Sequence, residues 1–230
     1  MNLSPTIALF SVIGGLLPAI FWLHFWLHED NAHPEPRGRI IYTFIMGMIG
    51  VILVIPIEQL VSNYFIDGSL ISFFLWASSE ELIKFGIAYF TALRTRYFDE
   101  PIDAVIYMIT AAVGFSALEN TFFILQPLIQ GDNLGTIISG NIRFIGASLL
   151  HVAASSIVGV SLAFAFYKSK ITKWISGIIG LIIAIILHTA FNFFIIESES
   201  QYILLVLGSI WISAILLIVI IERIKFIRSH

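Results

Sequence analysis

The sequence contains no cysteine. This absence excludes disulfide bonds, thiolate nucleophiles and thiolate metal sites, so any metal must be held by histidine and carboxylate side chains. Two catalytic motifs are missing as well. The lack of HExxH argues against a zinc site carried on one helix, and the lack of GxSxG argues against a serine nucleophile at a strand-to-helix turn.

Charged residues are scarce. Asp, Glu, Lys and Arg together make up 12% of the 230 residues, whereas hydrophobic residues make up 58%. This balance is far from that of a soluble globular domain and is typical of an integral membrane protein. The net charge is −3 and the basic residues form no patch, so we expect no nucleic-acid partner.

What fills the sequence instead is a series of unbroken apolar runs, each long enough for a helix to cross a bilayer. They predict seven membrane-spanning helices, at residues 5–27, 40–62, 69–93, 103–125, 136–167, 174–196 and 201–222. We therefore expect residues 1–230 to form a single all-α transmembrane bundle in the cell membrane, with no soluble domain. The first run lacks a basic leader and a clear cleavage site, so we expect a retained helix.

The basic residues predict the orientation of this bundle. Outside the runs, Lys and Arg occur only after the first, third, fifth and seventh runs: Arg37, Arg39, Arg94, Arg96, Lys168, Lys170, Lys173, Arg223, Lys225 and Arg228. By the positive-inside rule, the N-terminus faces outward and the C-terminus faces inward. Lys84 and Arg143 are the two basic residues inside runs.

Four ionisable residues inside the runs share one depth: Glu80, Glu119, His151 and His188. Each lies 14 to 17 residues from the charged residue at the inner end of its run, which is about 21–26 Å along a helix. An isolated charge at such a depth costs at least about 2.5–3.5 kcal/mol. These residues must therefore face the bundle interior, a water-filled cavity or a partner.

Two imidazoles and a carboxylate at one depth match the three protein ligands of a catalytic zinc site, in which a fourth position holds water. We therefore expect Glu119, His151 and His188 to bind a divalent metal, with zinc as the best match. A nearby glutamate would act as general base on that water, and the adjacent pair Glu80 and Glu81 supplies one.

Simpler roles exist for several of these residues. Lys84 stands at i+4 from Glu80 and i+3 from Glu81, so a structural ion pair would account for one acid but not for both. Each histidine alone could donate one hydrogen bond between helices. Ser155, at i+4 from His151, makes a serine–histidine pair geometrically possible, but that pair would leave the buried acids without a role.

The remaining polar residues favour structural roles. Four of them lie near predicted helix ends and are interpreted as interfacial side chains: His24, His28, His33 and Glu58. Gly114, Ser116 and Ala117 allow a neighbouring helix to approach closely. Arg143 lies two turns outward from His151 on about the same face, where it could reach the outer surface or hold a carboxylate or a substrate carbonyl.

Four segments, in this order and spacing, resemble the PrsW family of bacterial intramembrane proteases, which is distantly similar to the CAAX-protease and bacteriocin-processing (CPBP) membrane proteases. They are EELIK at 80–84, EPIDAVIYMITAAVGFSALEN at 100–120, RFIGASLLH at 143–151 and LHTAFNF at 187–193. All four lie between residues 69 and 196. The chain departs from many relatives of this wider group in having Asn192 where aspartate is common and Phe123 where tyrosine is common.

The resemblance implies hydrolysis of peptide bonds within the membrane or at its outer edge, typically in a single-span regulatory protein such as an anti-sigma factor. Glu80 is then expected to be the general base, with Glu81 paired to Lys84 or assisting. Asn120 and Asn192 would stabilise the oxyanion or orient ligands. A glutamate and histidine arrangement that activates water without a metal would use the same residues.

Two other functions fit the same buried residues. A proton- or ion-coupled transporter also places Glu and His residues near the midplane of the membrane, where they form proton relays. A family member without activity could serve as a membrane scaffold or receptor.

Overall fold

Each predicted span corresponds to a helical segment in the computed structural model, which describes residues 4–31, 33–196 and 203–227. The α-helices are α1 (Pro5–Leu27), α2 (Arg37–Tyr64), α3 (Leu70–Ala88), α4 (Pro101–Gln130), α5 (Asn133–Ile142), α6 (Ser148–Phe164), α7 (Lys170–Ile196) and α8 (Ile203–Ile224). No strand occurs in these described ranges. The all-α prediction is confirmed, while Arg228 lies outside the described residues.

Two of the predicted spans contain a π-helical turn that the sequence did not predict. Residues Tyr89–Leu93 extend α3, and residues Arg143–Ala147 join α5 to α6 in one continuous helical segment. Such wide turns are rare in proteins, and those that occur are often found at functional sites. The second one begins at Arg143, which is one of the two basic residues inside the spans.

Among the residues that the structure describes, six helical segments are long and apolar enough to cross a membrane, with α5 and α6 counted together. The seventh, α3, differs because it carries Glu80, Glu81 and Lys84 within 19 residues. The chain is therefore a multi-pass membrane protein, and α3 is the span that brings three charged side chains into its interior.

Helix α4 is the centre of the bundle, because 94% of its most apolar stretch is buried. It packs against α1, α2, α3, α5 and α6. Glycine allows two of these close approaches: a Cβ at Gly114 would lie 2.9 Å from the backbone carbon of Phe44, and one at Gly159 would lie 2.6 Å from Val105 Cα. The predicted close approach at Gly114 is confirmed, and it brings α2 against the middle of α4, while the one at Gly159 brings α6 against the start of α4.

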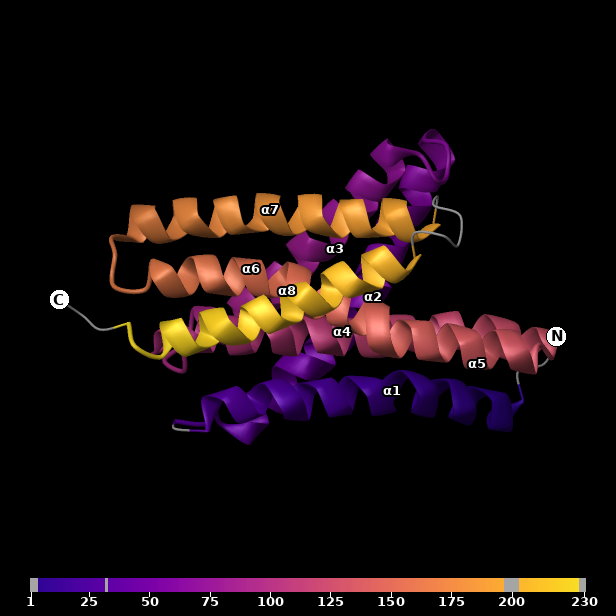
Figure 1. Ribbon diagram of the computed structural model, residues 1–230, viewed down its shortest axis with the longest axis horizontal. Helices are drawn as coiled ribbons and strands as arrows, with labels where there is room; N and C mark the ends of the chain where they lie inside the picture. The colour runs from indigo at the N-terminus through magenta and orange to yellow at the C-terminus, as the bar shows by residue number, and fades with distance from the viewer. Residues whose placement is uncertain (1–3, 32, 197–202, 228–230) are drawn as a thin grey trace.

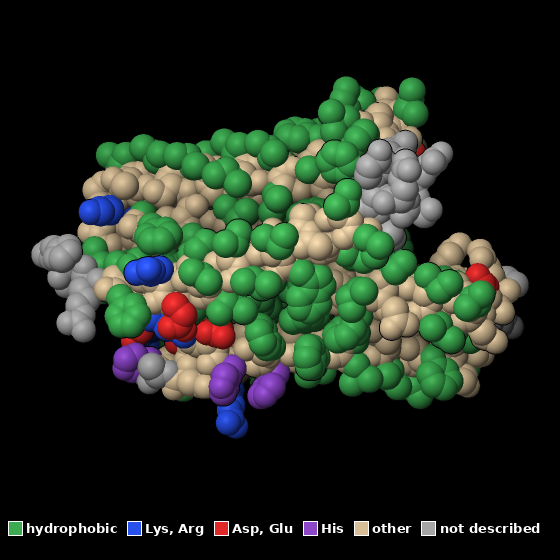
Figure 2. Space-filling view, in the orientation of Figure 1, with side chains coloured by type: hydrophobic (Ala, Val, Ile, Leu, Met, Phe, Trp, Pro, Cys, Tyr) green, Lys and Arg blue, Asp and Glu red, His purple; other side chains and the backbone are tan. Residues whose placement is uncertain are grey.

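Most helices run roughly along the long axis, with α1 beginning at one end of the molecule and α8 ending at the other, whereas α2 and α3 cross them obliquely (Figure 1). Most of the charged side chains visible in Figure 2 gather near the end where α8 finishes, and hydrophobic side chains cover much of the remaining surface. This separation matches the alternation of basic and non-basic breaks in the sequence. The outward direction of the N-terminus stays a prediction.

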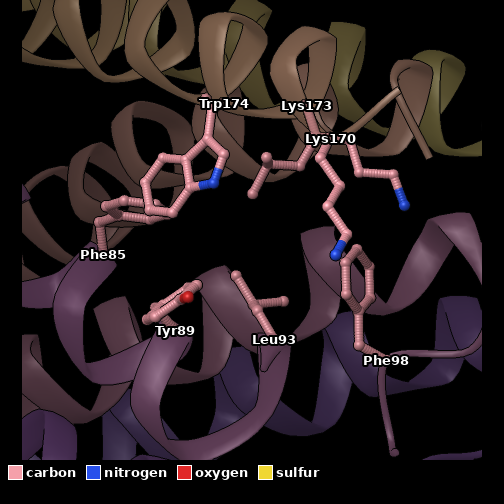
Figure 3. A pocket seen from close by; sticks show the side chains of 9 residues that line it. Phe85, Tyr89, Leu93, Phe98, Lys170, Lys173 and Trp174 are labelled. Carbon is pink, nitrogen blue, oxygen red and sulfur yellow. The ribbon is translucent and has the colours of Figure 1, made fainter. Parts of the chain in front are cut away.

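A small pocket of about 140 Å³ lies beside the first turns of α7, near the end of the molecule where the charged side chains gather. Figure 3 shows Trp174 and Tyr89 facing each other across it, with ring centroids 5.8 Å apart, and Lys170 and Lys173 alongside. Aromatic rings beside lysines are typical of the level at which helices leave the hydrocarbon. This pocket is therefore interpreted as part of the membrane boundary.

Candidate active site

Glu80, Glu81 and Lys84 lie on one buried face of α3. Glu81 and Lys84 are fully buried, and Glu80 is 4% exposed. Lys84 Nζ lies 2.7 Å from Glu81 Oε1 and 3.2 Å from Glu80 Oε2, so a single ammonium group pairs with both acids. The helical spacing of the three residues produces this arrangement, because positions i, i+3 and i+4 share a face.

The two glutamates are held very differently. Glu81 Oε1 contacts Lys84 and also His188 Nδ1, at 2.8 Å, and Oε2 accepts a hydrogen bond from Ser155 at 2.7 Å. Glu80 Oε2 is buried and has no hydrogen-bond partner among the described residues, since the approach of Lys84 is an ion-pair contact only. Glu81 is therefore anchored, whereas Glu80 keeps an oxygen for another group.

His151 from α6 and His188 from α7 both lie near that oxygen. His151 Nδ1 is 3.8 Å and His188 Nε2 is 3.9 Å from Glu80 Oε2, and the two rings stand 5.2 Å apart. Ionised Glu81, which lies beside Lys84, can only accept, so Nδ1 of His188 donates to it and Nε2 of the neutral ring carries the lone pair. A carboxylate oxygen that lacks a hydrogen-bond partner among the described residues therefore lies close to a basic nitrogen in a buried place.

This group could hold a metal ion. One ligand atom each from Glu80, His151 and His188 lie within 4.8 Å of one another. Two imidazoles and one carboxylate are a donor set that suits zinc, and the Glu80 oxygen without a hydrogen-bond partner among the described residues supports the fit. The sequence predicted Glu119 as the carboxylate ligand, but Glu119 does not belong to this compact group.

Glu119 on α4 instead contacts two basic side chains. Its Oε2 lies 2.9 Å from His151 Nε2 and 2.5 Å from Arg143 Nη2. Lys84 Nζ, which can only donate, lies 2.9 Å from His151 Nδ1, so the ring hydrogen is on Nε2 and goes to Glu119. Of the roles considered for Arg143, the structure shows that of holding a carboxylate.

A pocket of about 780 Å³ opens beside these residues. Its polar wall includes Glu80, Glu119, Arg143, His151, His188 and Asn192. Its apolar wall is built largely from α2, α4 and α6, including Val51, Val54, Ile55, Phe115, Phe122, Phe123 and Leu150. The pocket continues along α2 to polar residues near the end of that helix: Glu58, Gln59, Ser62 and Asn63. Glu58, interpreted from sequence as interfacial, thus forms part of the pocket wall.

The two asparagines occupy different positions. Asn120 accepts a hydrogen bond from Arg143 Nε at 2.5 Å and donates to the hydroxyls of Ser116 and Ser148. Asn192 borders the pocket, one helical turn beyond His188 on α7. Asn120 therefore positions an arginine, while Asn192 is the amide that faces the space beside the acids. Their predicted catalytic roles stay predictions.

Two contacts in the site were missed by the sequence analysis. Ser155 was considered only as a partner of His151, yet its hydroxyl donates to Glu81. Lys84 was considered only as a partner of the two glutamates, yet it also contacts His151. The one available signal was the i, i+4 spacing of His151 and Ser155, because a helix face that turns His151 toward α3 also turns Ser155 there.

Comparison with known proteins shows the family to which this chain belongs. Residues 35–221 match the model of the PrsW family intramembrane metalloproteases. Protease PrsW of Geobacillus kaustophilus is 27% identical over 168 residues, covering 70% of this chain and 68% of that protein. Protease PrsW of Bacillus subtilis is 24% identical over 194 residues, covering 80% and 83%.

A third relative, Protease PrsW of Clostridioides difficile, is 25% identical over 200 residues, covering 83% of this chain and 80% of that protein. No solved structure matches the chain. The family match spans α2 to α8 almost completely and includes every residue of the buried site. The chain therefore belongs to the PrsW family of intramembrane proteases and is a multi-pass protein of the cell membrane.

Proposed function

We propose that this protein is an endopeptidase that hydrolyses peptide bonds of membrane-anchored proteins inside the pocket beside α3. The observation that carries the proposal is the buried Glu80 Oε2, which lacks a hydrogen-bond partner among the described residues and lies 3.9 Å from His188 Nε2. A carboxylate with a free lone pair is what a general base needs in order to take a proton from water.

The other residues of the site keep this base and its neighbours in position. Glu81 holds His188 through Nδ1 and Ser155 holds Glu81, so the free nitrogen of His188 stays beside Glu80. Lys84 lies beside both acids and keeps them compatible with burial, since unpaired charges there would be costly. Glu80 accepts the proton of water as the oxygen attacks the carbonyl carbon, and later returns it to the leaving amine.

We further propose that the site works with a divalent metal, zinc, held by His151 and His188 with one carboxylate, which requires Lys84 to move away from His151 Nδ1. When bound, such a metal supplies a Lewis acid for the carbonyl and lowers the pKa of water toward about 7. Asn192, which borders the pocket, is the proposed amide donor to the developing negative charge on the carbonyl oxygen.

The shape of the pocket supports a membrane-anchored substrate. Apolar side chains of α2 and α4 line much of it, and polar residues line its end near Asn63. A single-span protein brings an apolar segment followed by a polar flank, which matches this order. We therefore propose a single-span regulatory protein, of the kind that an anti-sigma factor represents, as the substrate.

The proposal is tested with the purified chain in lipid vesicles and a single-span model peptide. Glu80→Gln removes the base and is expected to lower the cleavage rate by at least about 100-fold. Glu222→Gln, the same chemical change on the exposed side of α8, is the matched control and should leave the rate unchanged. Full cleavage by the Glu80→Gln protein would overturn the proposal.

Metal content separates the roles of the two candidate carboxylates. If Glu80 is the base and Glu119 is a ligand, the Glu80→Gln protein keeps its zinc and the Glu119→Gln protein loses it. If Glu80 itself is the ligand, the pattern reverses. Activity that disappears on chelation and returns with zinc supports the metal, whereas undiminished cleavage by zinc-free protein refutes it.

A further inference from the structure

A second group of acids lies at the other end of α4. Asp30 follows α1, Glu35 belongs to the connection from α1 to α2, and Asp103 stands in the first turn of α4. One carboxylate oxygen from each lies within 4.8 Å of the other two. Asp30 is 4% and Asp103 is 1% exposed, so two of the three acids are buried.

Helix capping explains only one of these acids. Asp103 Oδ2 accepts hydrogen bonds from the backbone N–H groups of Asp99 and Glu100, at 2.9 and 2.6 Å, and so caps α4. The hydroxyl of Tyr107 donates to Glu35 Oε2. The buried Oδ2 of Asp30 has no hydrogen-bond partner among the described residues.

Two basic residues nearby pair with acids outside this group. Within the described part of the chain, no Lys, Arg or His nitrogen lies within 4 Å of the carboxylates of Asp30, Glu35 or Asp103, whereas His33 pairs with Glu100 at 2.9 Å and Lys225 pairs with Glu29 at 3.1 Å. Three neighbouring carboxylates without a cation repel one another strongly when they are partly removed from water.

Arg39, which follows this connection in the sequence, does not fill the gap. Its Nη1 donates to the backbone oxygen of Thr91 at 2.8 Å, and its guanidinium stacks on Tyr97 at 4.5 Å. The chain therefore gathers negative charge here and supplies no neutralising side chain among the described residues. Of the three acids, Asp30 lines a pocket of about 430 Å³ at the charged end of the bundle visible in Figure 2.

We propose that Asp30, Glu35 and Asp103 bind a hard divalent cation, Mg²⁺ or Ca²⁺. Every donor in the group is an oxygen, which favours these ions over zinc or copper. The adjoining pocket leaves room for the water molecules that complete their coordination. A cation at this place would fasten the connection between α1 and α2 to the start of α4.

This site is separate from the one proposed for catalysis. Asp103 and Glu119 are 16 residues apart on α4, which corresponds to about 24 Å along the helix. The two donor sets also differ, since the catalytic group contains two imidazoles and this one contains none. Loss of either site should therefore leave binding at the other intact.

The test uses the full-length protein in detergent and Tb³⁺, a luminescent probe of oxygen-rich cation sites that a nearby phenol sensitises. Tyr107 provides that phenol, because its hydroxyl contacts Glu35. We expect saturable luminescence that Ca²⁺ or Mg²⁺ displaces, and at least tenfold weaker binding in Asp30→Asn and Glu35→Gln. Glu29→Gln, a neighbouring acid outside the group, is the matched control and should bind normally.

A second measurement keeps the proposal falsifiable if a variant fails to fold. The unfolding temperature of the unaltered protein should rise when millimolar Mg²⁺ or Ca²⁺ is added after chelation, because a ligand that binds only the native state stabilises it. The proposal is overturned if the unaltered protein shows neither saturable binding nor a shift, or if Asp30→Asn and Glu35→Gln bind Tb³⁺ as well as Glu29→Gln does.

Discussion

At the scale of single residues, the adjacent acids Glu80 and Glu81 differ in the contacts that they make. Glu81 contacts Lys84, His188 and Ser155, whereas Glu80 keeps a buried oxygen without a hydrogen-bond partner among the described residues. A helix presents two neighbours in sequence about 100° apart, so they meet different surroundings. One carboxylate can then be structural while the other remains reactive.

The same change from glutamate to glutamine is therefore expected to affect stability at Glu81 and cleavage at Glu80. Glu81→Gln should lower the free energy of unfolding by about 3–5 kcal/mol, because it takes the closer carboxylate from the buried Lys84 ammonium. Glu80→Gln should change stability much less while it abolishes cleavage. Thermal unfolding of both proteins in the same detergent checks this, and equal destabilisation by the two changes would contradict it.

The sequence could predict which residues meet but not which bonds they form. Depth and helical face follow from counting, and these brought Glu80, Glu119, His151 and His188 together correctly. The contact between Lys84 and His151, at 2.9 Å across 67 positions, depends on the side-chain rotamers and on the distance between two helices. No pattern within a single helix encodes those quantities. The sequence therefore could not show that Glu80 would form the compact group with both imidazoles.

At the scale of helices, small residues determine how closely the helices around the site can pack. A side chain added at Gly114 would meet the backbone of Phe44, so α2 and α4 would have to separate. Gly114→Ala is therefore expected to destabilise the protein by about 1–3 kcal/mol, as overpacking does. Unfolding measurements compare it with Gly208→Ala, where no atom lies within 4 Å of the added carbon.

The control is expected to be neutral or slightly stabilising, because alanine is the better helix former. Equal losses from both changes would mean that close packing at Gly114 is not the cause. Helix positions were predictable to within a few residues, since each span is a continuous apolar run. The π-helical turn at Arg143–Ala147 was not predictable, because its single extra residue per turn leaves hydropathy unchanged.

At the scale of the whole molecule, the lack of cysteine makes the predicted orientation directly testable. A single cysteine introduced at Ser169, between α6 and α7, should react with a membrane-impermeant maleimide only after intact cells are opened. A cysteine at Asn133, the first residue of α5, should react in intact cells. Both positions are exposed. The unaltered chain gives no background because it has no thiol, and the reverse labelling pattern would invert the orientation.

The polar end of the large pocket has a consequence for what the enzyme can cut. A peptide bond inside a membrane helix is shielded by its own turn, and freeing it leaves amide groups unsatisfied in lipid, each at a cost of several kcal/mol. Gln59, Ser62 and Asn63 border the pocket and offer replacement partners for a few such amides. Susceptibility would then depend less on the side chains at the cut than on how easily the local helix melts. Glycine or proline placed near the polar flank of a substrate should mark where it is severed.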